Sequence, residues 1–239
     1  MGRCSLAERR VVVSCEHGGN RVPARYRKLF AGEEGLLATH RGQDIGVLPL
    51  ADELSERLGV PLHAGTVTRL LVDLNRSIGS RTLFSEFTRD LPQAERKSIL
   101  DRYYHPYREG VTAEVASHVT AGEQVLHLSL HSFTPEWHGI ERRADLGLLY
   151  DSRRPHEVDF CAELQQALLQ AAPHLRVRRN YPYQGASDSL VTTLRRRFPP
   201  EPYLGIEIEV NQKHPAGDGQ QWGEMRRVVC EVLATQINP

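Results

Sequence analysis

Residues 10–20 read RVVVSCEHGGN, and this stretch decides the fold class of the 239-residue chain. Its first half is a run of β-branched residues, which is typical of a strand buried on both faces. The run ends in Glu16 and His17, and two glycines then supply a turn. Active sites of α/β proteins lie where such strands end. We therefore expect an α/β protein with a functional site at the end of this strand.

Strands and helices alternate along the rest of the chain. Apolar residues at helical spacing predict helices over 45–58, 102–121, 158–172, 190–197 and 223–236. Shorter apolar runs predict strands over 61–64, 69–76, 125–131, 145–150 and 203–210. The polar segment 84–97 lacks a clean period and is expected to cross the surface. The alternation predicts a three-layer α/β/α arrangement with a mostly parallel or mixed sheet, in a single domain over residues 1–239.

Composition excludes several classes of protein. Lysine plus arginine (30) equals aspartate plus glutamate (30), so no global positive field attracts nucleic acid. The arginine clusters at 176–179 and 195–197 are expected to be solvated helix ends. No apolar run reaches the roughly 18 residues of a membrane span, and residues 1–10 lack the apolar part of a secretory signal. We expect a soluble, cytoplasmic protein.

The four cysteines have no metal-binding spacing and are expected to be reduced thiols. They are Cys4, Cys15, Cys161 and Cys230. The sequence carries no signal for the oligomeric state.

Polar residues stand at the ends of several predicted strands. They are Glu16 and His17, Arg69 with Asn75 and Arg76, His131, and Glu209. Because strand ends converge on one crevice in α/β folds, we expect these side chains to share a site. Each signal also has a plainer interpretation, since Arg69 can be a surface charge, and Glu207 and Glu209 can lie on the solvated face of an edge strand.

A hydrolytic zinc site needs about three protein ligands and an open position for water. His17 and His131 supply two imidazoles. For the third ligand we favour Asp44, just before the helix predicted from residue 45, over Glu16 or Asn20, because zinc prefers a carboxylate to a neutral amide. Asp44 can equally be only the N-cap of that helix, and both interpretations stay open.

Five motifs occur in order between residue 11 and about residue 212. They are HGGNRVP at 17–23, GQDIG at 42–46, Arg69 leading to DLNR at 73–76, HSFTP at 131–135 and NYPYQG at 180–185. Together they resemble the N-formylglutamate amidohydrolase family, which is related to zinc carboxypeptidases and aspartoacylase. The resemblance implies a phosphorylase/hydrolase-like α/β/α sandwich and a catalytic zinc ion. Asn20 stands where the carboxypeptidase pattern has a glutamate, which is a further reason to favour Asp44 as a ligand.

The resemblance also implies roles for individual residues. Asn75 and Arg76 resemble a pair that grips a substrate carboxylate, for which the planar fork of arginine is suited. Arg69 resembles the arginine that polarises the scissile carbonyl. Glu209 resembles the glutamate that takes a proton from the attacking water and passes it to the leaving amine.

The loop at 180–188 is expected to close over the substrate, with Tyr183 and Asp188 as binding residues. Its alternative interpretation is an ordinary surface turn before the helix at 190–197. The sequence thus predicts a zinc-dependent hydrolase that cleaves N-formyl-L-glutamate or a similar small N-acyl amino acid in amino-acid metabolism. The alternatives are a zinc deacylase or carboxypeptidase with another N-acyl substrate, and a non-catalytic binding protein on the same fold.

Overall fold

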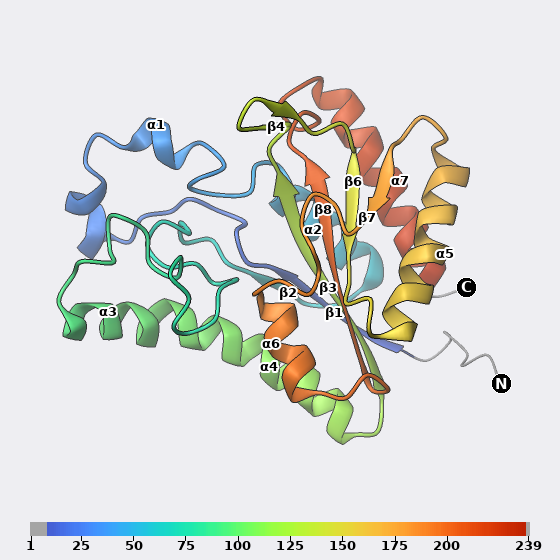
Figure 1. Cartoon of the computed structure of the whole chain (residues 1–239), viewed down its shortest axis with the longest axis horizontal. Coiled ribbons are helices and arrows are strands. Elements are labelled where there is room, and N and C mark those ends of the chain that lie inside the picture. Colours follow the sequence, from blue (N-terminus) through green and yellow to red (C-terminus); the bar gives the residue numbers. More distant parts are fainter. Residues whose placement is uncertain (1–8, 238–239) are drawn as a thin grey trace.

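A six-stranded mixed sheet forms the centre of the computed structural model, which describes residues 9–237 (Figure 1). The strand order is β2-β1-β3-β8-β6-β7. The first four strands are parallel, whereas β6 pairs antiparallel with β8 and parallel with β7. The strands of this sheet are β1 (Arg9–Cys15), β2 (Leu62–Ala64), β3 (Gln124–Phe133), β6 (Leu146–Leu149), β7 (Val177–Arg179) and β8 (Tyr203–Asn211). The predicted mixed sheet is confirmed.

Helices cover both faces of the sheet. Helices α2 (Val47–Leu58), α5 (Pro155–Ala171) and α7 (Gly219–Ile237) pack on one face through the largest apolar cluster. Helices α4 (His105–Thr120) and α6 (Leu190–Arg197) pack on the other (Figure 1). The remaining elements are a 3₁₀ helix (Ala24–Phe30), α1 (Glu34–Leu37), α3 (Gln93–Ile99), a π-helical turn (Leu100–Tyr104) and a hairpin of β4 (Glu136–Trp137) and β5 (Ile140–Glu141). The three-layer α/β prediction is therefore confirmed.

The two faces of the central strands differ in chemistry. On β3 the leucines at 126, 128 and 130 belong to the apolar cluster under α2, α5 and α7. The alternate residues on β3 are His127, Ser129 and His131, and on β8 the register places Glu207 beside Ser129 and Glu209 beside His131. Because side chains alternate along a strand, these polar groups share the α4/α6 face. That face is apolar near the amino ends of the parallel strands, where Val12, Val125 and Tyr203 lie, and polar toward their carboxyl ends.

The strand predicted over 69–76 was wrong. These residues form a series of turns after an isolated bridge between Arg21 and Val67. Their apolar side chains enter a second cluster beside the sheet, with Tyr26, Phe30, Ile99 and Tyr104. Side chains bond main-chain carbonyls that a sheet would otherwise satisfy: Thr88 donates to Leu71 at 3.0 Å and Arg108 donates to Leu74 at 2.9 Å. The apolar residues of this segment pack in a cluster beside the sheet, so their presence alone did not indicate a strand.

The predicted surface excursion at 84–97 was wrong in its second half. Helix α3 begins after Pro92 and continues through the π-helical turn into α4. Phe84 and Phe87 also pack against the second cluster. The other predicted helices and strands are confirmed to within a few residues. Helix α2 ends at Leu58, and Gly59 caps it with a φ of 65°, a conformation that favours glycine.

The second arginine cluster is a solvated helix end only in part, because Arg196 and Arg197 are exposed in the last turn of α6 whereas Arg195 is buried. Arg195, in the last turn of α6, is buried and lies 3.0 Å from the carboxylate of Glu157. It also donates to the main-chain oxygen of Gly185 and thereby ties the loop at 180–188 to the fold.

Cys15, Cys161 and Cys230 are free and buried, as expected of reduced thiols. Cys4 and most of the segment discussed as a possible signal lie outside the described residues. Within residues 9–237 no helix is long and apolar enough to cross a membrane.

Gly147 allows the loop at 180–188 to reach the carboxyl end of β8. It lies opposite Glu209 in the sheet. A Cβ atom at this position would overlap the main-chain oxygen of Tyr181. The absence of a side chain at 147 lets the loop pass directly beside Glu209, so that the loop forms a wall of the site described below.

Candidate active site

His17 lies two residues after β1 and is almost fully buried. Its Nε2 atom is 2.7 Å from Oδ1 of Asp73. Because a carboxylate accepts hydrogen bonds, this contact places the ring proton on Nε2. Nδ1 has no hydrogen-bond partner among the described residues and lies 3.5 Å from Oδ2 of Asp44. His17 therefore presents a free lone pair on Nδ1.

His131 on β3 is held in the same manner. Its Nε2 atom lies 3.0 Å from the carboxylate of Glu16 and 3.0 Å from the hydroxyl of Ser129. Its Nδ1 atom faces Oδ2 of Asp44 at 2.9 Å. Burial alone would lower the pKa of His131, but Asp44 and Glu16 raise it well above its usual value. Both imidazoles are thus oriented by carboxylates on Nε2 and turn Nδ1 toward Asp44.

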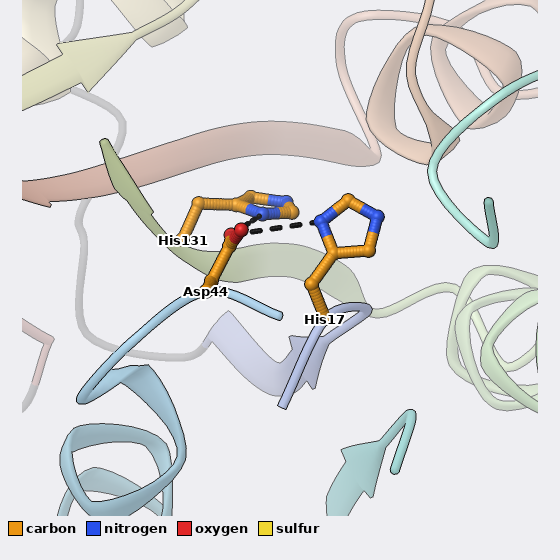
Figure 2. Close-up of side chains that lie close together, drawn as sticks. All are labelled: His17, Asp44 and His131. Carbon is orange, nitrogen blue, oxygen red and sulfur yellow. Dashed lines mark hydrogen bonds and ion pairs between the residues drawn. The ribbon is translucent and has the colours of Figure 1, made fainter. Parts of the chain in front are cut away.

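Asp44 joins the two histidines. Its main-chain nitrogen donates to the carbonyl of His17 at 2.9 Å, which draws the segment before α2 toward the end of β1. Figure 2 shows one carboxylate oxygen of Asp44 between the two rings. Burial would raise the pKa of this carboxyl group, but His17, His131 and Arg69 hold it well below its usual range. The N-cap interpretation is wrong, because Gly46 occupies that position without a side-chain cap.

The other candidate ligands lie elsewhere. Asn20 donates its amide to the main-chain oxygen of Leu37 at 3.0 Å. Glu16 lies behind His131, where it accepts from Ser129 at 2.7 Å and from Tyr107 at 3.2 Å. Neither residue lines the cavity that holds His17 and Asp44.

The group formed by His17, Asp44 and His131 fits a divalent metal. All three are buried, and their ligand atoms lie within 4.8 Å of one another. Two ligand atoms on a tetrahedral zinc ion are about 3.3 Å apart, given bonds of roughly 2.0–2.1 Å. The observed separations of 3.5 Å and 2.9 Å lie within a few tenths of an ångström of this value. The partnerless Nδ1 of His17 and the carboxylates behind both rings complete the arrangement expected of a metal site.

Arg69 binds the two aspartates that contact His17. It donates to Asp44 at 3.1 Å and to Asp73 at 2.8 Å, and Asp73 also accepts from the main-chain nitrogen of Asn75 at 2.9 Å. Burial would raise the pKa of Asp73, but Arg69 and His17 hold it well below its usual range. These contacts keep the carboxylate of Asp73 charged and fixed against Nε2 of His17.

We expect Asp73→Asn to weaken zinc binding about 10–100-fold, because outer partners of metal-binding histidines have effects of this size. The affinity is measured by chelator competition. Asp145→Asn is a matched control, since Asp145 also bonds a histidine, His214, at 2.9 Å but lies outside the cavity. Equal zinc affinity of the Asp73 variant and the wild type would contradict the role of His17 as a ligand.

A cavity of about 610 Å³ brings the predicted site residues together. It is lined by all nine: His17, Asp44, Arg69, Asn75, Arg76, His131, Tyr183, Asp188 and Glu209. Glu209 is buried in the middle of the sheet and does not lie on a solvated edge strand, and its Oε2 atom has no partner among the described residues. Burial raises the pKa of Glu209 to about 8, with Asp44 and Glu207 adding to the shift against His131.

Asn75 and Arg76 have different environments. The amide of Asn75 contacts Nε2 of His131 at 3.2 Å and accepts from the main-chain nitrogen of Leu190 at 2.7 Å, so both of its polar atoms are engaged. Arg76 donates to the main-chain oxygen of Asp188, a neutral acceptor. Among the described residues no carboxylate pairs with Arg76, which leaves its charge available in the cavity.

The loop at 180–188 forms one wall of the cavity. Asp188 accepts from the main-chain nitrogen of Ser77 at 3.1 Å, which fastens the loop to the segment that carries Arg76. The Tyr183 hydroxyl accepts from Arg142 at 3.2 Å, and Arg142 stacks between Tyr183 and Trp137. The loop is therefore part of the site and not an unrelated surface turn.

Some lining residues were not predicted from the sequence. Asp73 stood inside a quoted motif without a role, and its carboxylate beside Asn75 was the available signal. His40, Arg41 and Trp137 also line the cavity. No pattern in their neighbourhoods indicated this, because the turns that carry them are placed by contacts distant in sequence.

The fold and the site define a class: an α/β protein with its cavity at the carboxyl ends of parallel strands, built around a candidate metal centre. The family model for N-formylglutamate amidohydrolase matches residues 9–214. The chain therefore belongs to the N-formylglutamate amidohydrolase family, and it is a hydrolase that acts on amide bonds.

Several solved structures resemble the chain, among them the following two. One is a gene product from Agrobacterium tumefaciens, with 29% identity and a TM-score of 0.75 over 96% of this chain and 92% of that one. The other is the N-formylglutamate amidohydrolase from Ralstonia eutropha, with 21% identity and a TM-score of 0.68 over 97% of this chain and 94% of that one. At these identities the likeness shows the fold. The comparison with curated proteins gave no match.

Proposed function

We propose that this protein is a zinc-dependent hydrolase that removes a formyl or similar small acyl group from the amino group of an amino acid. The observation that carries the proposal is the buried group of His17, Asp44 and His131, in which both Nδ1 atoms face Oδ2 of Asp44 in the cavity that Glu209 also lines. A zinc ion supplies Lewis acidity, which polarises an amide carbonyl and makes water nucleophilic near neutral pH.

Glu209 is suited to move the proton. Its partnerless, buried oxygen lies in the same cavity as the three candidate ligands. A base that later acts as an acid works best with a pKa near the working pH. The raised pKa of Glu209, about 8 in the protein without metal, meets this requirement. Glu209 takes the proton of the attacking water and delivers it to the leaving amine.

Two arginines bind charge on the substrate. Arg69 is held by Asp44 and Asp73, so its guanidinium is fixed at the cavity wall, where it stabilises the developing oxyanion. Arg76 has no carboxylate partner among the described residues, and it binds the carboxylate of the amino acid. Asn75 supports this segment through Leu190 and His131. Tyr183 and Asp188 border the bound substrate from the loop.

A non-catalytic binding protein on this fold has less support, because it gives no role to a buried, partnerless Glu209 beside a candidate metal centre. A deacylase or carboxypeptidase with another N-acyl substrate would use the same catalytic residues. Only a comparison of substrates distinguishes these enzymes from the proposed one. A cytoplasmic location, a role in amino-acid metabolism and the single-domain organisation stay predictions.

The test combines elemental analysis of the purified protein with release of formate from N-formyl-L-amino acids before and after chelation. We expect about one zinc ion per chain, activity that is lost on chelation, and recovery when zinc is added back. Absence of bound metal under every loading condition would overturn the assignment of His17, Asp44 and His131.

A further inference from the structure

Glu207 is a second glutamate in the cavity, and the proposed mechanism has no use for it. It lies on β8, two residues before Glu209 and on the same face of the strand. Its side chain lines the cavity and the residue is only 6% exposed. Its Oε1 atom has no hydrogen-bond partner among the described residues. Burying a carboxylate oxygen without a hydrogen-bond donor costs free energy, so a bound ligand that supplies a donor to Glu207 would be favoured.

The neighbouring strands do not supply that donor. Glu207 lies between Ser129 on β3 and Leu149 on β6. The hydroxyl of Ser129 already donates to Glu16 at 2.7 Å, and Leu149 has no polar side chain. Two residues of strand separate Glu207 from Glu209 by about 6.6 Å. A substrate with its scissile bond at Glu209 therefore places a group several bonds away near Glu207.

The charges of the cavity indicate what that group is. The lining includes five carboxylates and three arginines: Asp44, Asp73, Asp188, Glu207 and Glu209, with Arg41, Arg69 and Arg76.

Most of these charges are already matched. Arg69 binds both Asp44 and Asp73, and Arg41 pairs with Glu86 outside the cavity. Among the described residues, Arg76 is then the lining arginine without a carboxylate partner, and the lining carboxylates of Asp188, Glu207 and Glu209 form no ion pair. A zinc ion at His17, Asp44 and His131 would add positive charge at the scissile end of the cavity, where it serves the amide carbonyl. A substrate with two carboxylates, such as N-formylglutamate, still finds one free arginine, and its side-chain carboxylate would approach the unpartnered oxygen of Glu207. A substrate with one carboxylate and one cationic donor complements the same wall.

We propose that Glu207 binds a cationic hydrogen-bond donor on the side chain of the substrate, so that the preferred substrates are N-acyl derivatives of basic amino acids. This inference rests on the proposed function and specifies its substrate class. Arg76 holds the α-carboxylate, Glu209 serves the scissile amide, and Glu207 accepts from the side-chain ammonium or guanidinium.

The test measures kcat/KM of the zinc-loaded protein for Nα-formyl-L-lysine, Nα-formyl-L-glutamine and Nα-formyl-L-glutamate. A charge-assisted hydrogen bond contributes about 1.5–3 kcal/mol, which corresponds to roughly 10–150-fold. We expect the lysine derivative to exceed the glutamate derivative by at least about 10-fold. Glu207→Gln should remove most of this preference by lowering kcat/KM for lysine and not for glutamine. Glu163→Gln, on the exposed side of α5, is the matched control and should leave all three values unchanged.

The outcomes separate this inference from the proposed function. Hydrolysis of the glutamate derivative in preference to lysine, with the ratio unchanged in Glu207→Gln, overturns the inference and leaves the zinc hydrolase intact. Failure to hydrolyse any of the three, with zinc bound, counts against the proposed function. In that case, calorimetric measurement of the binding of L-lysine and L-glutamate to the wild type decides the inference. Tighter binding of glutamate than of lysine would overturn it. The wild-type preference is decisive even if the variant does not fold, although a near-isosteric glutamine that removes a buried charge is expected to keep the melting temperature.

Discussion

Glu209→Gln is expected to lower kcat about 10²–10⁴-fold, the usual contribution of a positioned acid–base group, while the protein keeps its full complement of zinc. Glutamine fills the same space between His131 and Gly147 but cannot take a proton from water. It also removes a buried carboxylate whose pKa burial raises to about 8. Folding stability should therefore not fall. The measurements are kcat, zinc content and thermal unfolding.

The control for this variant is Glu163→Gln, which makes the same chemical change on the outer helix α5. Full activity is expected there. A Glu209→Gln protein that retains zinc and more than a tenth of wild-type kcat would show that another group moves the proton, and Glu207 would be the next residue to test.

His17→Ala is expected to abolish both tight zinc binding and activity. The substitution removes the Nδ1 lone pair and leaves Asp73 without its imidazole partner. Zinc affinity should fall by more than the roughly 10–100-fold that follows loss of an outer partner. Because a ligand that binds only the folded state stabilises it, zinc should raise the melting temperature of the wild type and not that of the variant. Chelator competition and thermal unfolding with and without zinc provide the two readouts.

His118→Ala serves as the control for loss of a histidine. His118 contacts Glu123 at 2.6 Å near the end of α4 and does not line the cavity. The zinc affinity of the His118→Ala protein should equal that of the wild type. Zinc binding of equal strength in His17→Ala and His118→Ala would exclude His17 from the metal site, whatever the loss in activity.

Much of the site was predictable because it lies at strand ends. The strands that lead to His17, His131 and Glu209 show either a β-branched run or an alternation of apolar and polar residues, so they can be predicted from the sequence. The polar residues at their carboxyl ends can then be located as well. Parallel pairing of β1, β3 and β8 then brings these ends to one edge of the sheet. The convergence follows from the α/β topology itself.

The segment at 69–76 shows where such reasoning failed. A short apolar run has the same composition whether it enters a sheet or packs beside it. Here Leu70, Leu71 and Leu74 pack in the second cluster, which also contains Tyr26 and Ile99, and the segment forms turns instead of a strand. Its polar residues still line the cavity. The main-chain N–H of Arg69 donates a hydrogen bond to the carbonyl of Gly42 at 3.2 Å, which keeps Arg69 near Asp44.

By itself, the sequence determined the α/β class, the strand ends that carry the histidines and Glu209, and the family through its five motifs. These features are local, since periodicity and motif order are properties of neighbouring residues. Only the tertiary structure decided that Asp44 turns to both histidines while Asn20 turns to Leu37, that Asp73 and Glu16 orient the rings, and that Glu207 faces the cavity without a donor. Each of these depends on contacts between segments far apart in the chain, which side-chain packing fixes and local sequence does not.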